Sequence, residues 1–146
     1  MVRPDPDRMK LLTFQARRFA WKSFSKTLEE ASDETVADEV AEAVVVFLHA
    51  DEKDARDDER ARVFRHTLKH VKWLANKRDL KNVVLHSFTH LGADNADSDF
   101  ALGFIDELAE RLGSTGYGVK TTPFGWFCEW DLAVYGDSLA KVWKEV

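Results

Sequence analysis

The sequence predicts an α/β domain with additional β structure packed on its sheet. Two segments indicate this class, because residues 44–79 and residues 82–112 each read as a buried strand followed by an amphipathic helix. Two strands before these units and two strands after them supply the additional β structure. The expected order is strand, strand, strand–helix, strand–helix, strand, strand, helix.

The chain has the size of a single domain, at 146 residues. Pro4 and Pro6 indicate a loose leader over residues 1–8, which leaves residues 9–146 as one folded domain. No apolar run approaches the roughly 20 residues that a membrane-spanning helix needs, and no secretory signal opens the chain. A single cysteine excludes an internal disulfide framework, so we expect a cytoplasmic protein that does not associate with membranes.

The first elements precede the two strand–helix units. Residues 10–15 and 17–24 are predicted to be short strands of one hairpin, and residues 28–39 an acidic, partly helical connection. Residues 44–48 are apolar and mostly β-branched, which is typical of a strand buried on both faces.

Two helices and four further elements follow. Residues 51–79 are predicted to be a long helix with an acidic start, a basic end and a core stripe of Phe64, Leu68, Val71 and Ala75. Residues 82–88 read as a strand. The second helix begins near Ser98 and ends at a Gly113 cap; its inward residues are Ala101, Ile105, Leu108 and Leu112. Strands at 116–122 and 126–134 and a helix at 137–146 complete the chain.

Charge is distributed unevenly along the chain. The net charge is −5, and residues 27–59 hold thirteen of the 26 acidic residues. This acidity argues against avid, non-specific binding of nucleic acid. The long helix nevertheless carries a basic stripe, which either tracks phosphates or forms an ordinary solvated face: Arg62, Arg65, Lys69 and Lys72. Trp73 lies opposite the core stripe, where the terminal helix covers it or a subunit interface does.

The histidines form two pairs. His66 and His70 are four residues apart on a helix, a spacing that can bind a metal, but neighbouring bases favour a solvated face. His86 and His90 flank the end of a buried strand, where α/β domains bind ligands, so each is either a binding or acid–base residue or a structural one. The chain lacks a phosphate-binding glycine loop, a G-x-S-x-G elbow and an EF-hand register, so we expect neither a metal nor a cofactor.

Four stretches carry a resemblance to a known family: MKLLTF, AEAVVVFLHADEKD, NVVLHSFTHLG and GYGVKTTPFGWF. From Met9 onward, the chain resembles the archaeal-type editing domain of threonyl-tRNA synthetase, whose fold is similar to D-aminoacyl-tRNA deacylase. The most specific motifs are F-x-H-L at residues 88–91 and P-F-G with an aromatic pair at residues 123–127. The resemblance implies an α/β fold that layers helices, a sheet and a smaller sheet.

The resemblance also implies a function and a site. Members of this family remove serine wrongly attached to threonine tRNA, with the 2′-hydroxyl of the terminal ribose helping to activate water. By this resemblance, His90 lines a pocket for the 3′-terminal aminoacyl-adenosine. The walls and backbone contacts come from Phe88 and two segments: Val45, Val46, Phe47 and Leu48, and Pro123, Phe124, Gly125, Trp126 and Phe127.

Two positions depart from the family pattern. The family usually has a lysine after the aromatic pair, where this chain has Cys128, and a glutamate in the terminal helix, where ungapped alignment places Lys141. Lys141 therefore reaches the pocket if a terminal helix presents it there. Strand alternation places Cys128 with apolar Trp130 and Leu132, so the thiol is either a small packed hydrophobe or a nucleophile paired with His86 or His90.

The leading hypothesis is a freestanding deacylase that hydrolyses L-seryl-tRNA(Thr) in trans by a substrate-assisted mechanism. The alternative is a catalytically impaired module of the same fold that binds tRNA or a threonyl-tRNA synthetase. A cysteine-dependent hydrolase is a third reading. A homodimer is expected from relatives of this fold, with Trp73 available for its interface.

Overall fold

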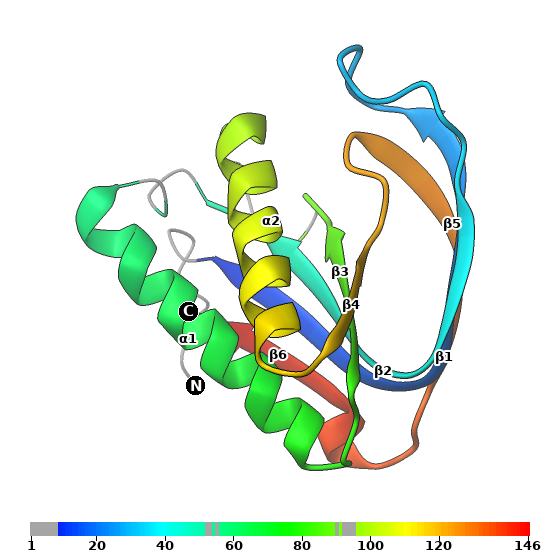
Figure 1. Ribbon diagram of the computed structural model, residues 1–146, viewed down its shortest axis with the longest axis vertical. Helices are drawn as coiled ribbons and strands as arrows, with labels where there is room; N and C mark the ends of the chain where they lie inside the picture. The colour runs from blue at the N-terminus through cyan, green and yellow to red at the C-terminus, as the bar shows by residue number, and fades with distance from the viewer. Residues whose placement is uncertain (1–8, 52–53, 55, 90, 92–95) are drawn as a thin grey trace.

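The computed structural model describes residues 9–51, 54, 56–89, 91 and 96–146. In this part of the chain, a six-stranded mixed sheet carries two helices on one of its faces (Figure 1). The leader predicted at residues 1–8 lies outside the described residues. Neither described helix is long and apolar enough to cross a membrane.

The first strand, β1 (Lys10–Lys26), is a single long strand and not the predicted hairpin. No glycine, proline or asparagine interrupts the sequence here, so nothing in it favours a tight turn. A register shift between Ala16 and Arg18 in the pairing with β5 marks an irregularity instead. Lys10–Phe14 pairs with β6, and Ala16–Lys26 pairs with β5, so one strand serves two neighbours on the same edge.

The predicted strand–helix units are confirmed. β2 (Ala37–His49) lies antiparallel to β1 and parallel to β3 (Asn82–Ser87), which in turn lies parallel to β4 (Gly118–Thr121). The strand order is β4-β3-β2-β1-β5, with β6 beside the first half of β1. The second half of β1 and β5 (Trp126–Val134) curl away from the helices (Figure 1).

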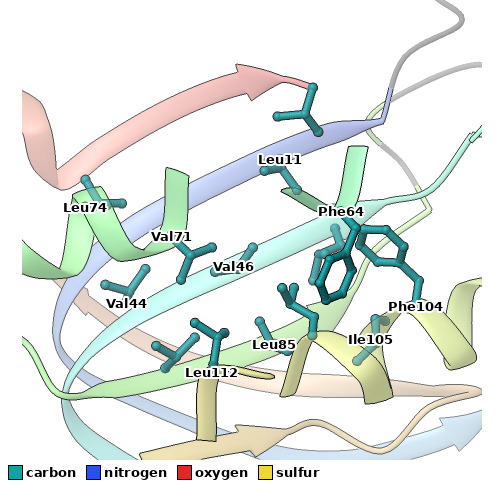
Figure 2. Close-up of a cluster of buried hydrophobic side chains, with 14 of the residues drawn as sticks. Leu11, Val44, Val46, Phe64, Val71, Leu74, Leu85, Phe104, Ile105 and Leu112 are labelled. Atoms are coloured by element: carbon teal, nitrogen blue, oxygen red, sulfur yellow. The ribbon is translucent and has the colours of Figure 1, made fainter. Parts of the chain in front are cut away.

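The helices α1 (Asp57–Asn76) and α2 (Ser98–Ser114) cover the main apolar core (Figure 2). The predicted stripes face this core, as Phe64, Val71 and Leu112 are buried there. α1 begins several residues later and ends slightly earlier than predicted. The end of α2 also differs from the prediction, because the left-handed residue is Gly116, with φ 102°, and not Gly113.

The other face of the sheet carries a second, smaller core. It is made largely of aromatic and β-branched side chains from β1, β2 and β3: Phe19, Trp21, Val45, Phe47 and Val84. Phe88 and Cys128 pack against its margin. The helices, the sheet and the curled β structure therefore form the layers that the sequence predicted.

The predicted terminal helix is wrong. A 3₁₀ turn at Ser138–Ala140 leads into the strand β6 (Lys141–Glu145), which pairs with Lys10–Phe14. Val142 and Val146 pack toward the helices with a strand's period of two, and the N–H of Val146 donates to the carbonyl of Met9 at 3.1 Å. The free edge of β1 outweighs the helical propensity of this short segment.

Candidate functional site

A pocket of about 440 Å³ opens where β3 ends. It lies between the first turn of α2, the loop before β5 and β5 itself, beside the smaller core. Its lining includes Phe88 and all five residues of the P-F-G segment, 123–127, which the family resemblance assigned to a substrate pocket. The described lining residues are Thr27, Leu28, His86, Ser87, Phe88, Thr89, Ala96, Ser98, Ala101, Pro123, Phe124, Gly125, Trp126, Phe127, Cys128 and Trp130.

Gly125 shapes one wall of the pocket through its backbone. Its φ of 80° is a conformation that other residues rarely adopt, and a Cβ atom here would lie 2.8 Å from the Cβ of Ala31. The Gly125 carbonyl accepts hydrogen bonds from the N–H groups of Thr27, at 2.7 Å, and Leu28, at 3.3 Å. The P-F-G turn thereby anchors the loop after β1 against the pocket.

Thr27 and Leu28 are site residues that the sequence reasoning missed. Leu28 opens the acidic connection at residues 28–39, which was predicted only as a linker between strands, and Thr27 directly precedes it. No local pattern marks them, because their place depends on a turn nearly 100 positions further along the chain. The Gly125 motif was the only available signal that another segment approaches closely.

His86 stands at the inner wall of the pocket. Its Nδ1 lies 2.7 Å from the hydroxyl of Thr122, and its ring lies 5.0 Å from that of Phe47 and 5.2 Å from that of Trp130. Burial lowers the pKa of His86 to about 4, so the imidazole is neutral at physiological pH. The ring is thus firmly held, and it does not contribute a positive charge to the pocket.

An aromatic cluster forms the apolar side of the site. The rings of Phe88 and Trp130 lie 5.5 Å apart, and each lies about 5 Å from Phe47, at 5.3 and 4.9 Å. Trp130 remains 42% exposed, so part of its face is open to a ligand. The cluster offers stacking surface at fixed positions.

Cys128 lines the pocket and is half-buried, packed against the smaller core. Burial raises the pKa of the thiol above its ordinary value, which keeps it protonated at neutral pH. Leu132 packs against the same core, as the predicted alternation requires. The geometry therefore favours a small packed hydrophobe over an activated nucleophile.

Lys141 lies away from this pocket. It is exposed on β6, where its Nζ donates to the carbonyl of Tyr135 at 3.2 Å, and it is not among the lining residues. The prediction that Lys141 reaches the pocket depended on a terminal helix, and that segment is a strand. The second predicted catalytic residue, His90, lies outside the described residues.

The four predicted residues of β2 do not line the pocket either. Val45 and Phe47 face the smaller core, whereas Val46 and Leu48 face the helices. β2 is an interior strand paired with both β1 and β3, so its backbone groups serve the sheet. Phe47 alone acts on the site, by packing against His86, Phe88 and Trp130.

The helix α1 shows a further difference. His70 is not solvated as the charge pattern indicated, because only 7% of the residue is exposed and its Nε2 lies 3.1 Å from the hydroxyl of Thr13. Within the described residues, the two helical histidines meet no third group that could complete a metal site. Trp73 is 43% exposed, and its ring stacks on His70.

The fold and the pocket define a domain of the D-aminoacyl-tRNA deacylase type. A solved structure described as "c-Myc DNA Unwinding Element Binding Protein" superposes with a TM-score of 0.66 over 94% of this chain and 98% of that chain, at 13% identity. Another, described as a probable eukaryotic D-amino acid tRNA deacylase, superposes with a TM-score of 0.63 over 94% of this chain and 99% of that chain, at 11% identity. Such low identities show the shared fold alone.

Residues 9–146 match the model of the archaea-specific editing domain of threonyl-tRNA synthetase, and the chain belongs to this family. A threonine–tRNA ligase of Staphylothermus marinus is 30% identical over 142 residues, and one of Methanosphaerula palustris is 26% identical over 139 residues. In both comparisons the alignment covers 94% of this chain and 22% of the relative. The chain thus spans about a fifth of the length of these curated relatives.

Proposed function

We propose that this domain hydrolyses the ester of mischarged aminoacyl-tRNA, with L-seryl-tRNA(Thr) as its substrate. The observation that carries the proposal is the pocket, which joins the two family motifs in one cavity at the end of β3. Its volume of about 440 Å³ suits a small-molecule group such as a terminal aminoacyl-adenosine. The open face of Trp130 and the Phe88 ring offer stacking surface for the adenine.

The chemistry of the lining favours a substrate-assisted reaction. Among the described lining residues there is no lysine, arginine, aspartate or glutamate. His86 is a weak base, because burial lowers its pKa to about 4, and its Nδ1 is held at 2.7 Å from the Thr122 hydroxyl. The thiol of Cys128 stays protonated, so neither side chain is prepared to attack the ester. Within the described lining, no side chain is better placed to activate water than the substrate's own 2′-hydroxyl, which is adjacent to the esterified 3′-oxygen.

In the proposed reaction, a water molecule attacks the ester carbonyl carbon, and this water donates a hydrogen bond to the 2′-hydroxyl as it does so. The bond between the carbonyl carbon and the 3′-oxygen then breaks, and a proton from the water passes to the 3′-oxygen. The protein contributes position, since the Gly125 turn and the aromatic cluster fix the adenosine. The N-terminal turn of α2 brings Ser98 to the pocket.

The experiment uses this 146-residue chain in trans with L-seryl-, L-threonyl- and D-aminoacyl-tRNA(Thr). We expect seryl-tRNA to lose its amino acid fastest, and we expect a terminal 2′-deoxyadenosine to abolish that loss. Hydrolysis of every substrate at the buffer rate overturns the proposed activity. Equal hydrolysis of the 2′-deoxy substrate overturns the mechanism but not the activity.

A second function is favoured by Cys128, which stands where the family has a lysine. If that lysine stabilises the developing oxyanion, its replacement costs roughly 10²–10³-fold in rate. The domain would then act mainly as a module that binds tRNA or a threonyl-tRNA synthetase. Cys128→Lys separates the two functions. A large gain in the rate of seryl-tRNA hydrolysis would show that the wild-type domain is an impaired catalyst. An unchanged rate, in a wild-type domain that hydrolyses seryl-tRNA, would support the first proposal. Lys141→Glu is the matched control, since Lys141 lies outside the pocket.

A further inference from the structure

A second cavity, of about 630 Å³, lies between α1 and β6, outside the pocket described above. We name it the α1–β6 groove. Figure 1 shows α1 running alongside the core strands on the side where β6 lies, whereas β5 curls away on the other side. The groove is lined by His66, Lys69, His70, Trp73, Val142, Trp143 and Lys144.

The groove is positively charged. Four residues recur along one face of α1, at positions 62, 66, 69 and 73, and they are all basic or aromatic: Arg62, His66, Lys69 and Trp73. Lys77, the C-cap of the helix, adds a further cation 5.8 Å from the centre of the Trp73 ring. Lys144 faces them from β6. Among the described residues, no aspartate or glutamate lines the groove, and the nearby Glu145 accepts a hydrogen bond from the Trp143 indole at 3.5 Å.

His66 reports this positive potential. Its pKa is lowered by partial burial and then by the positive charges of Arg62, Arg65 and Lys69 on α1 and Lys144 on β6. The four charged groups that lower this pKa most are all cations, although the whole chain carries a net charge of −5. The groove therefore concentrates positive charge on a protein that is acidic overall.

Trp73 forms a fixed aromatic surface in the groove. One side of its indole stacks on His70, with centroids 6.0 Å apart and planes 28° apart, and the residue remains 43% exposed. Thr13 donates to the carbonyl of Val142 at 2.8 Å, so its hydroxyl accepts from Nε2 of His70, 3.1 Å away. The His70 ring is thus held by Thr13 of β1, and it supports one side of the Trp73 indole.

We propose that the α1–β6 groove binds single-stranded RNA, with a base stacked on Trp73 and backbone phosphates on Lys69 and Lys144. An exposed aromatic platform beside cations is the combination that single-stranded nucleic acids use. A second copy of this chain fits less well, because a two-fold interface here would bring two positive grooves together. The proposal goes beyond the deacylase function, and it holds whether or not the pocket catalyses.

The experiment measures the fluorescence anisotropy of a labelled uridine 12-mer against the whole chain at several salt concentrations. We expect Trp73→Ala to weaken binding at least about fivefold, and Trp73→Phe to retain most of it, because stacking on one base is lost only in the first. Lys69→Ala with Lys144→Ala should lower the slope of log affinity against log salt by about 1.4, for two lost phosphate contacts.

The matched control is Lys22→Ala with Lys81→Ala, which removes the same charge from exposed sites elsewhere. If the two double-lysine variants lose the same affinity for the 12-mer, only the net charge of the protein matters, and the proposed site is wrong. An unaltered affinity in Trp73→Ala would also overturn the site, as would a change from dimer to monomer in that variant without any loss of RNA binding.

A second readout does not depend on how well the variants fold. Nuclear magnetic resonance titration of His66 in the wild-type protein should show a higher pKa when the 12-mer is bound, because phosphates offset the surrounding cations. An unchanged His66 titration with bound RNA would place that RNA elsewhere. Deacylation of seryl-tRNA is scored separately, so failure of the pocket and failure of the groove are distinguishable.

Discussion

Replacing Gly125 by alanine tests the proposed construction of the pocket. Two costs follow from the structure. A φ of 80° strains any residue with a Cβ atom, by about 1–2 kcal/mol. The new Cβ would also lie 2.8 Å from the Cβ of Ala31 and 3.2 Å from Cδ1 of Leu28, and crowding of this kind costs about 1–3 kcal/mol. Together, these terms lower the free energy of unfolding by about 2–5 kcal/mol.

The assay is urea unfolding of Gly125→Ala alone and combined with Ala31→Gly. Removing the Ala31 Cβ eliminates the 2.8 Å contact and leaves the 3.2 Å contact with Leu28, so the double variant should regain part of the crowding cost and keep the backbone strain. The single variant should also lose pocket function, because the Gly125 carbonyl anchors Thr27 and Leu28. The control is Gly113→Ala, where a Cβ meets nothing within 4 Å and a helical alanine should stabilise by up to about 1 kcal/mol. A Gly125→Ala protein as stable as the wild type would refute the reasoning.

Three further predictions follow from buried or misplaced groups. Burial lowers the pKa of His70 and His86 to about 4, below the 6.5 of the unfolded chain, so stability is full above pH 6.5 and falls as pH drops toward 4. Asp54 has the opposite effect, because its pKa is raised to about 6 and it therefore adds stability as the pH falls below 6. Between pH 7.5 and pH 5, the free energy of unfolding measured in urea should fall by about 3 kcal/mol in total, and a flat profile would contradict this prediction. Cys128→Ala should retain the wild-type rate of seryl-tRNA hydrolysis, since the protonated thiol takes no chemical part; a hundredfold loss would restore the cysteine-hydrolase hypothesis. Lys141→Ala should leave the single-turnover rate of deacylation unchanged within about twofold, because this side chain lies outside the pocket and donates to the Tyr135 carbonyl. A tenfold loss of rate would show that Lys141 takes part in the reaction.

The sequence predicted the elements whose signal is local. The apolar run at residues 44–48 identified an interior strand, and the 3.6-residue period from Phe64 to Ala75 identified the face of α1 that packs in the core. The P-F-G motif was found through the family resemblance, and its Gly125 adopts a φ of 80° that glycine permits. In each case the information lies within a few residues of the feature.

The errors concern features that depend on distant partners. Residues 141–145 became a strand because β1 offers a free edge more than 120 positions earlier, which no local propensity records. His70 is buried and contacts Thr13 on β1, although Lys69 precedes it and Lys72 follows two residues later. Thr27 and Leu28 reached the pocket only through the carbonyl of Gly125. All three features depend on contacts with residues that are far away in the sequence.

The hydrogen bond between Val146 and Met9 has a consequence for how the domain is joined to other polypeptides. Because β6 runs back along the start of β1, the two ends of the folded unit, Met9 and Val146, lie side by side at one place in the fold. A linker attached at either end would leave from that point, and the pocket would keep its shape. The same fold therefore suits both a tethered arrangement, in which another domain delivers the tRNA end over a short path, and an untethered one.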